Sequence, residues 1–127
     1  MSGVEATGFV PDVAAEYACA AFTVAPIYSG GGSNIKVLES LAQARACVTT
    51  AYCLERFQPH FGGTGDIVAT ADDAAMVQSC IELLREPERR ETLARAGQKI
   101  VMAQFNYDAF RRVVHEQVRF AMKGNAH

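Results

Sequence analysis

Long apolar runs are missing from this 127-residue sequence, and so is a strong charge of either sign. No stretch approaches the ~20 apolar residues of a membrane-spanning helix, and residues 1–6 lack the basic and apolar regions of a secretory leader. We therefore expect a cytoplasmic protein with no transmembrane segment. The formal net charge of −2 gives no field that would attract nucleic acid, so no nucleic-acid partner is expected.

Several familiar site patterns are also absent. The four cysteines contain no Cys-x-x-Cys pair, and the histidines share no metal-ligand spacing with each other or with acids. We predict no metal site and buried free thiols, with a disulfide or metal site as the alternative, because Cys19 and Cys80 fall in apolar helical patterns. The Gly-x-Ser-x-Gly pattern of a serine nucleophile is missing too, and no catalytic residue is assigned.

The apolar pattern predicts one α/β domain over residues 1–127. A strand at 22–27, a helix from Ile35 to Ala42 and a strand at 46–51 form a βαβ unit, which implies parallel strands. The strand at 22–27 reads as buried on both faces because it has almost no polar alternation. Further expected elements are a strand at 4–10, a short helix after Asp12, a loop at 52–65, a strand at 66–69, and helices at about 73–86, 88–104 and 107–122, the first opened by a capping box of Thr70 and Asp73.

Three consecutive glycines, Gly30, Gly31 and Gly32, separate the predicted strand at 22–27 from the helix at Ile35. Without β-carbons a ligand can approach the backbone, and the free amides and dipole of a helix N-terminus favour an anion. No third spaced glycine and no Gly-Lys-Ser/Thr follows, so neither the dinucleotide fingerprint nor the P-loop is present. A tight structural turn is the alternative to a ligand cradle.

Glu39 and Lys36 favour the cradle. Helical side chains lean toward the helix N-terminus, so the Glu39 carboxylate can reach back over the first turn and accept from two neighbouring hydroxyls, such as those of ribose. Lys36, one turn earlier, can pair with Glu39 or neutralise a phosphate. The alternative is a solvated surface pair.

The segment "PIYSGGGSNIKVLESLAQARACVTT" resembles the donor-binding segment of retaining GT-B glycosyltransferases of the glycosyl transferases group 1 family, also called family 4. In that family a strand ending in Pro and a Gly-rich loop precede Lys-x-Leu-Glu-Ala-x-Ala-x-Gly and a strand like Pro-Val-Val-x-Thr. Flanking stretches are similar as well, so the likeness covers nearly the whole chain. The resemblance implies a Rossmann-like parallel sheet flanked by helices, as part of a GT-B C-terminal domain.

By this resemblance the chain binds a nucleotide-sugar, a UDP- or GDP-sugar, as donor substrate and needs no cofactor. Glu39 resembles the glutamate that binds the ribose diol, and the Gly30–Ser33 backbone resembles the loop at the donor phosphate and sugar, with Ser33 and Asn34 as further polar contacts. The glutamate that the family carries eight positions before Glu39 is replaced by Gly31. Arg45 and Ala46 stand where Gly and Pro are usual, and Glu55 with Arg56 resembles a Glu-Gly pair near the donor.

The resemblance further implies a parent enzyme that transfers a sugar, with retention, to a glycan or lipid-linked acceptor in polysaccharide biosynthesis, and for which a peripheral position on a membrane is an option. The N-terminal acceptor domain is not encoded in these residues, so we expect the chain alone to be inactive. Strands that normally lie between 4–10 and 22–27 are missing, and either direct pairing of the remaining strands or a homo-oligomer should cover the open sheet edge. The alternatives are a non-catalytic nucleotide- or phosphate-binding module and a protein-interaction module.

Overall fold

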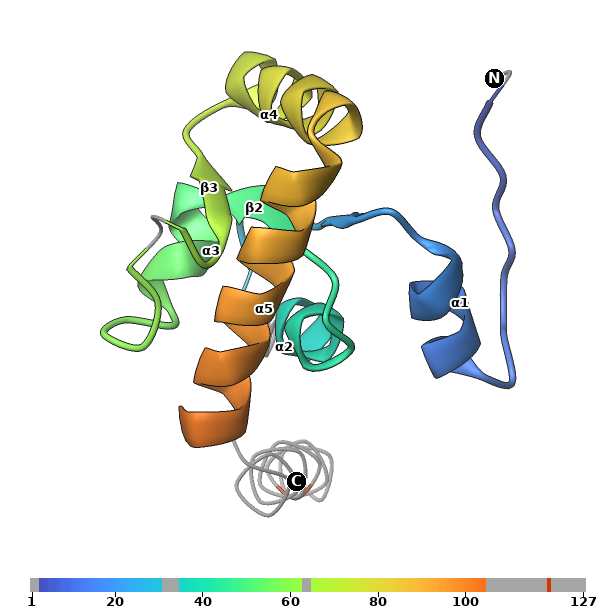
Figure 1. The fold of residues 1–127 in the computed structure, drawn as a ribbon, viewed down its shortest axis with the longest axis horizontal. Coiled ribbons are helices and arrows are strands. Elements are labelled where there is room, and N and C mark those ends of the chain that lie inside the picture. Colours follow the sequence, from blue (N-terminus) through green and yellow to red (C-terminus); the bar gives the residue numbers. More distant parts are fainter. Residues whose placement is uncertain (1–2, 31–34, 63–64, 105–118, 120–127) are drawn as a thin grey trace, which may run out of the picture.

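The computed structural model describes residues 3–30, 35–62, 65–104 and 119, and in these ranges the chain forms three strands and five helices (Figure 1). In chain order the elements are α1 (Val13–Cys19), β1 (Thr23–Val24), α2 (Ile35–Ala42), β2 (Cys47–Thr50), α3 (Ala51–Glu55), β3 (Val68–Thr70), α4 (Asp73–Arg85) and α5 (Pro87–Gln104).

The strands form one parallel sheet in the order β1-β2-β3. Thr23 lies opposite Cys47 in β2, and Val48 lies opposite Val68 in β3. Helix α2 connects β1 to β2, which confirms the predicted βαβ unit and the α/β class. A short parallel sheet flanked by helices is the expected architecture of a partial Rossmann-like GT-B domain.

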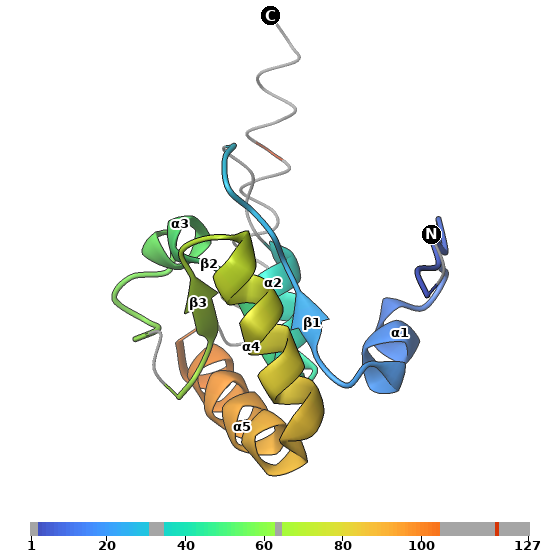
Figure 2. The same cartoon turned by 90° about the horizontal axis from the view of Figure 1, so that it is seen from above.

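The central strand β2 is buried on both faces. Cys47 belongs to a core with α2, α3 and the end of α5, while Val48 belongs to a second core with α4 and Leu93 of α5. Figure 1 shows α4 above the strands and α2 below them, and Figure 2 views the same arrangement from the side of α4. The expectation of two buried faces is wrong for β1, because the Val24 side chain is 45% exposed at the edge of the sheet.

Helix α5 approaches α2 closely at Gly97. A β-carbon built on Gly97 would lie 2.7 Å from Leu41 Cδ2 and 3.1 Å from the Asp66 carbonyl oxygen. The absence of a side chain at this position therefore sets how closely α5 packs on α2, which carries Lys36 and Glu39.

Local caps explain where the helices begin. Asp12 and Asp72 cap α1 and α4, accepting from the backbone N–H groups of Ala15 and Ala75 at 3.3 and 2.8 Å. The capping box of Thr70 and Asp73 is therefore wrong. Thr70 ends β3, and its hydroxyl donates to the Thr49 carbonyl oxygen at 3.0 Å.

Helix α3 lies where a loop was predicted. It starts immediately after β2 because Thr50, the last strand residue, is also its N-cap and accepts from the Cys53 N–H at 3.1 Å. The predicted helix at 88–104 is confirmed and begins at Pro87, a position where proline is favoured because its missing N–H is not needed.

The predicted strand at 4–10 is wrong, since these residues form no strand and carry exposed apolar side chains, with Val4 and Phe9 exposed to 69% and 93%. Direct pairing of this segment with the rest of the sheet is therefore also wrong. Within the described ranges the outer edge of β1 has no neighbouring strand. The predicted helix at 107–122 lies outside the described residues, Arg119 excepted.

The cysteines of the described chain are all free thiols. Cys47 and Cys53 are buried as predicted and Cys80 is half-buried, but Cys19 is exposed because α1 buries none of its residues. Among the helices of the described ranges, none has the length and apolar character that a membrane crossing requires.

Candidate functional site

The chain that leaves β1 is held at the carboxyl end of the sheet by β2. The Ala25 N–H donates to the Val48 carbonyl oxygen at 2.8 Å, and the Thr49 hydroxyl donates to the Ala25 carbonyl oxygen at 2.9 Å. The Thr50 hydroxyl donates to the Ile27 carbonyl oxygen. The carboxyl ends of parallel strands are where ligands gather in open α/β sheets, so the start of the glycine cluster lies where a site is expected.

Gly30 has a backbone conformation that requires glycine. Its carbonyl oxygen accepts hydrogen bonds from side chains of α3 and of the residue that caps this helix. Its φ of 101° lies in the region that side chains disfavour, and among the described residues no atom lies within 4 Å of a β-carbon built there. Its carbonyl oxygen accepts from the Tyr52 hydroxyl at 2.7 Å and from Arg56 Nη2 at 2.5 Å. The Arg56 guanidinium also lies over the Tyr52 ring, 5.0 Å from its centroid.

Gly31, Gly32, Ser33 and Asn34 lie outside the described residues, and the chain is described again from the first residue of α2. Lys36 in the first turn of this helix is exposed, and Glu39 in the second turn is half-buried. The neighbouring Val37, Leu38 and Leu41 are buried in the core and fix the orientation of α2. Within the described ranges no ion pair joins Lys36 to Glu39.

Glu39 contacts Tyr17 of α1. The Tyr17 hydroxyl lies 3.4 Å from Glu39 Oε2 and 3.4 Å from the Lys36 carbonyl oxygen, so one proton is shared between two acceptors. Partial burial, followed by the negative charge of Glu39, raises the pKa of Tyr17 to about 12. The phenol therefore stays protonated and remains a hydrogen-bond donor at neutral pH.

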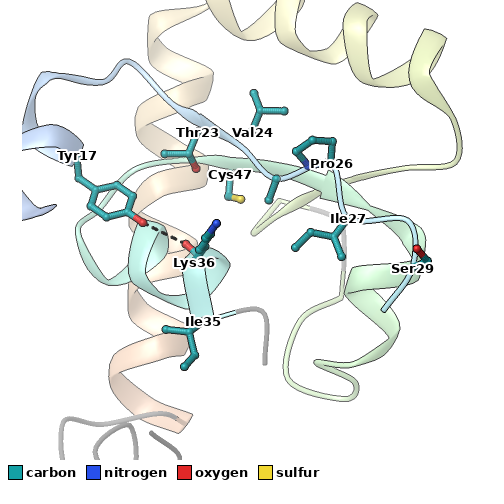
Figure 3. A pocket seen from close by; sticks show the side chains of 10 residues that line it. Tyr17, Thr23, Val24, Pro26, Ile27, Ser29, Ile35, Lys36 and Cys47 are labelled. Atoms are coloured by element: carbon teal, nitrogen blue, oxygen red, sulfur yellow. Dashed lines mark hydrogen bonds between the residues drawn. The ribbon is translucent and has the colours of Figure 1, made fainter. Parts of the chain in front are cut away.

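A cavity of about 580 Å³ lies beside this pair, along β1 and the start of α2 (Figure 3). Its wall combines mainly apolar side chains with the hydroxyls of Tyr17, Thr23 and Ser29 and with Lys36. In Figure 3 the Lys36 side chain extends from α2 toward β1. Glu39 does not line the cavity itself but borders it through Tyr17. The complete lining is Tyr17, Thr23, Val24, Ala25, Pro26, Ile27, Ser29, Ile35, Lys36 and Cys47.

Arg45 attaches α1 to the rest of the domain. Its guanidinium donates to the Tyr17 carbonyl oxygen at 2.7 Å and to the Ala18 carbonyl oxygen at 3.1 Å, at the C-terminal end of α1. A cation at this end also complements the helix dipole. Arg45 was noted only as a departure from the family pattern, and here it holds the helix that carries Tyr17.

The alignment of Arg45 with the glycine of the family pattern is wrong. Counting Lys-x-Leu-Glu-Ala-x-Ala-x-Gly from Lys36 places its glycine at Ala44 and not at Arg45. Ala44 has a φ of 55°, which is the left-handed conformation of a helix C-cap. The residue after it, Arg45, donates its N–H to the Ser40 carbonyl oxygen at 2.9 Å, as such a cap requires.

The sequence pattern placed Lys36 and Glu39 on one predicted helix. It did not identify Tyr17, Tyr52 or Arg45 as residues of the site. Tyr17 lies 22 residues from Glu39, and no local spacing connects them. In the described part of the chain, no three His, Cys, Asp or Glu side chains are grouped to hold a metal ion.

Comparison with known proteins gives one family. The model of the family described as "Glycosyl transferases group 1" matches residues 1–86, about two thirds of the chain, and the match ends after α4. No curated protein and no solved structure matches. The match includes the strand, glycine cluster and helix that surround the cavity. The chain belongs to the glycosyl transferases group 1 family.

Proposed function

We propose that this chain binds the nucleoside diphosphate part of a nucleotide-sugar donor at the glycine cluster. In this proposal Glu39 accepts from the two ribose hydroxyls, and Lys36 with the backbone at Gly30, Gly31, Gly32 and Ser33 faces the phosphates. Ser33 and Asn34 add polar contacts. The donor is a UDP- or GDP-sugar, and no metal or cofactor takes part.

The observation that carries the proposal is the position of α2. This helix follows the carboxyl end of a parallel strand, and its core residues Val37, Leu38 and Leu41 leave Lys36 and Glu39 beside the 580 Å³ cavity. A cation and a carboxylate on one side of a helix start suit a ligand that has both phosphates and a diol. Membership of a glycosyltransferase family supports the same ligand.

The parent enzyme would transfer the sugar with retention to a glycan or lipid-linked acceptor, as part of polysaccharide biosynthesis in the cytoplasm. In such a transfer the protein acts mainly by stabilising the charge of the departing diphosphate. Lys36 and the glycine amides would supply that stabilisation here. In this proposal the described residues supply the donor side of the site, and sugar transfer by this chain alone is not expected.

The test is nucleotide binding by the 127-residue chain, measured by thermal shift and isothermal titration calorimetry with UDP and GDP. A ligand that binds only the native state raises the free energy of unfolding by RT ln(1 + [L]/Kd), and the midpoint of unfolding rises with it. We expect Glu39→Gln to weaken binding about fivefold to tenfold, because the neutral amide accepts less strongly from the diol. Glu88→Gln, at an exposed position in the first turn of α5, is the matched control and should bind like wild type.

A protein-interaction module is the second candidate, favoured by the open outer edge of β1 and by the exposed side chains of Phe9 and Val24. It predicts self-association or partner binding that does not respond to nucleotides. Unchanged thermal stability with millimolar UDP and GDP would favour this candidate and contradict the donor site.

A further inference from the structure

Helix α1 is attached at the proposed donor site by polar contacts. None of its residues is buried, and its contacts with the domain include the Tyr17 hydroxyl on Glu39 and the Arg45 guanidinium on the last carbonyls of α1. Tyr17 is also part of the cavity wall. A side chain of this exposed helix thus reaches the carboxylate that is proposed to accept from the ribose hydroxyls.

The contact leaves room for a ligand on the same carboxylate. An ionised carboxylate has two oxygens with about four acceptor positions, and Tyr17 approaches Oε2 only. A ribose diol needs two of the remaining positions. The Tyr17 hydroxyl and a bound diol therefore do not exclude each other.

We propose that Tyr17 is a positioning residue that sets the selectivity of this site for ribose. Its hydroxyl restrains the Glu39 carboxylate beside the cavity, so that the acceptor positions it leaves free can meet both hydroxyls of a ribonucleotide. This inference rests on the proposed function and adds to it the sugar selectivity of the site and the residue that controls it.

Two further observations support the restraint. Lys36 forms no ion pair with Glu39 among the described residues, so this neighbouring cation does not orient the carboxylate. The pKa of Tyr17, raised to about 12 by burial and by the charge of Glu39, keeps the phenolic proton in place throughout the neutral range.

The experiment measures the Kd of UDP and of 2′-deoxy-UDP for the full chain by calorimetry, with GDP and 2′-deoxy-GDP as a parallel pair. Wild type should prefer the ribonucleotide. In Tyr17→Phe we expect this preference to fall about fivefold, which is the usual effect of one hydrogen bond, through weaker binding of the ribonucleotide alone. Affinity for the deoxynucleotide should stay the same.

Tyr28→Phe is the matched control. It removes a tyrosine hydroxyl that donates to a different carboxylate, Asp73, at 2.5 Å, and it should leave the ribose preference unchanged. Circular dichroism checks that each variant is folded. In the Glu39→Gln variant, the further change Tyr17→Phe should not lower the preference for the ribonucleotide any more. The carboxylate that Tyr17 restrains has then already been replaced.

The outcomes separate the two proposals. Wild-type binding with a ribose preference that Tyr17→Phe leaves intact would overturn the positioning role while the donor site stands. Tighter ribonucleotide binding in Tyr17→Phe would show that Tyr17 competes with the ligand, and would also overturn it. If wild type binds no nucleotide in either series, the proposed function fails and the inference fails with it.

Discussion

Ala44 ends helix α2 in a backbone conformation that favours glycine. Its φ is 55°, and the N–H groups of Ala44 and Arg45 bond to the Leu41 and Ser40 carbonyl oxygens at 3.0 and 2.9 Å, as in a Schellman cap. A β-carbon in the left-handed region costs about 1–2 kcal/mol. The helix that carries Glu39 therefore ends at a strained residue.

We predict that Ala44→Gly raises the free energy of unfolding by about 1 kcal/mol, because it removes this strain and keeps both bonds. Urea denaturation measures the change. Ala42→Gly, two residues earlier in the helix, is the control and should lower stability, since glycine is unfavourable at a helical position. Destabilisation by both variants would contradict the interpretation.

The Cys47 thiol makes the free energy of unfolding depend on pH in the alkaline range. Burial raises the pKa of this thiol to about 11, from 9.0 in an exposed cysteine, and a hydrogen bond with Thr23 opposes the shift. Between these two values the unfolded chain releases the proton while the folded chain keeps it. The free energy of unfolding must then fall as the pH rises from 9 to 11.

We predict that Cys47→Ala lowers stability at neutral pH but makes its decline above pH 9 less steep. Denaturation at several pH values measures the slope. Cys19→Ala removes an exposed thiol and should keep the wild-type slope. Equal slopes in both variants would show that Cys47 does not carry the effect.

At the scale of elements, the packing of α5 on α2 depends on Gly97. A β-carbon at Gly97 would lie 2.7 Å from Leu41 Cδ2, which is closer than real β-carbons approach, and 3.1 Å from the Asp66 carbonyl oxygen, which is tighter than most β-carbon contacts. Gly97→Val should lower the free energy of unfolding by about 1–3 kcal/mol, because overpacking separates the two helices. Ala103→Val, at an exposed position of α5, is the control and should have little effect. A loss in Gly97→Val no greater than that of Ala103→Val in urea denaturation would contradict overpacking at this contact.

Elements whose own residues show a clear pattern of apolar and polar positions were predictable from the sequence. The βαβ unit followed from apolar runs on either side of an amphipathic helix, and the strand predicted at 46–51 is the buried strand β2. Helix α3 was missed because Thr50 serves both as a strand end and as an N-cap, with no turn residue between. The segment at 4–10 has a strand-like composition, but no neighbouring strand pairs with it in the described residues.

In the site, too, local sequence patterns were predictable and tertiary contacts were not. Lys36 and Glu39 were found because they stand three positions apart on one helix. Tyr17 and Arg45 were not, because their roles depend on how α1 lies against α2, which is a tertiary arrangement. Helix periodicity cannot report contacts across 22 or 28 residues.

At the scale of the whole molecule, β1 is an open sheet edge within the part of the chain that the structure describes. The N–H groups of Thr23 and Ala25 bond to β2 at 2.9 and 2.8 Å, so the alternation of a strand directs the polar groups of Val24 outward. Unpaired strand edges favour association with another chain. The expected homo-oligomer would use this edge.

We predict that light scattering detects concentration-dependent dimers, and that Val24→Lys shifts the chain toward monomer because an edge lysine opposes strand pairing. Val77→Lys, which alters an exposed valine of α4, should leave association unchanged. A wild-type monomer at high concentration would contradict edge pairing.

The way α1 is held has a consequence for measurement. Seven residues are too few to remain helical in water by themselves, so the backbone amides of α1 are protected from hydrogen exchange only while the helix stays docked through Arg45 and Tyr17. The exchange rate of these amides is therefore a direct gauge of the docking equilibrium. A ligand that tightens the Glu39 region would therefore slow hydrogen exchange in α1.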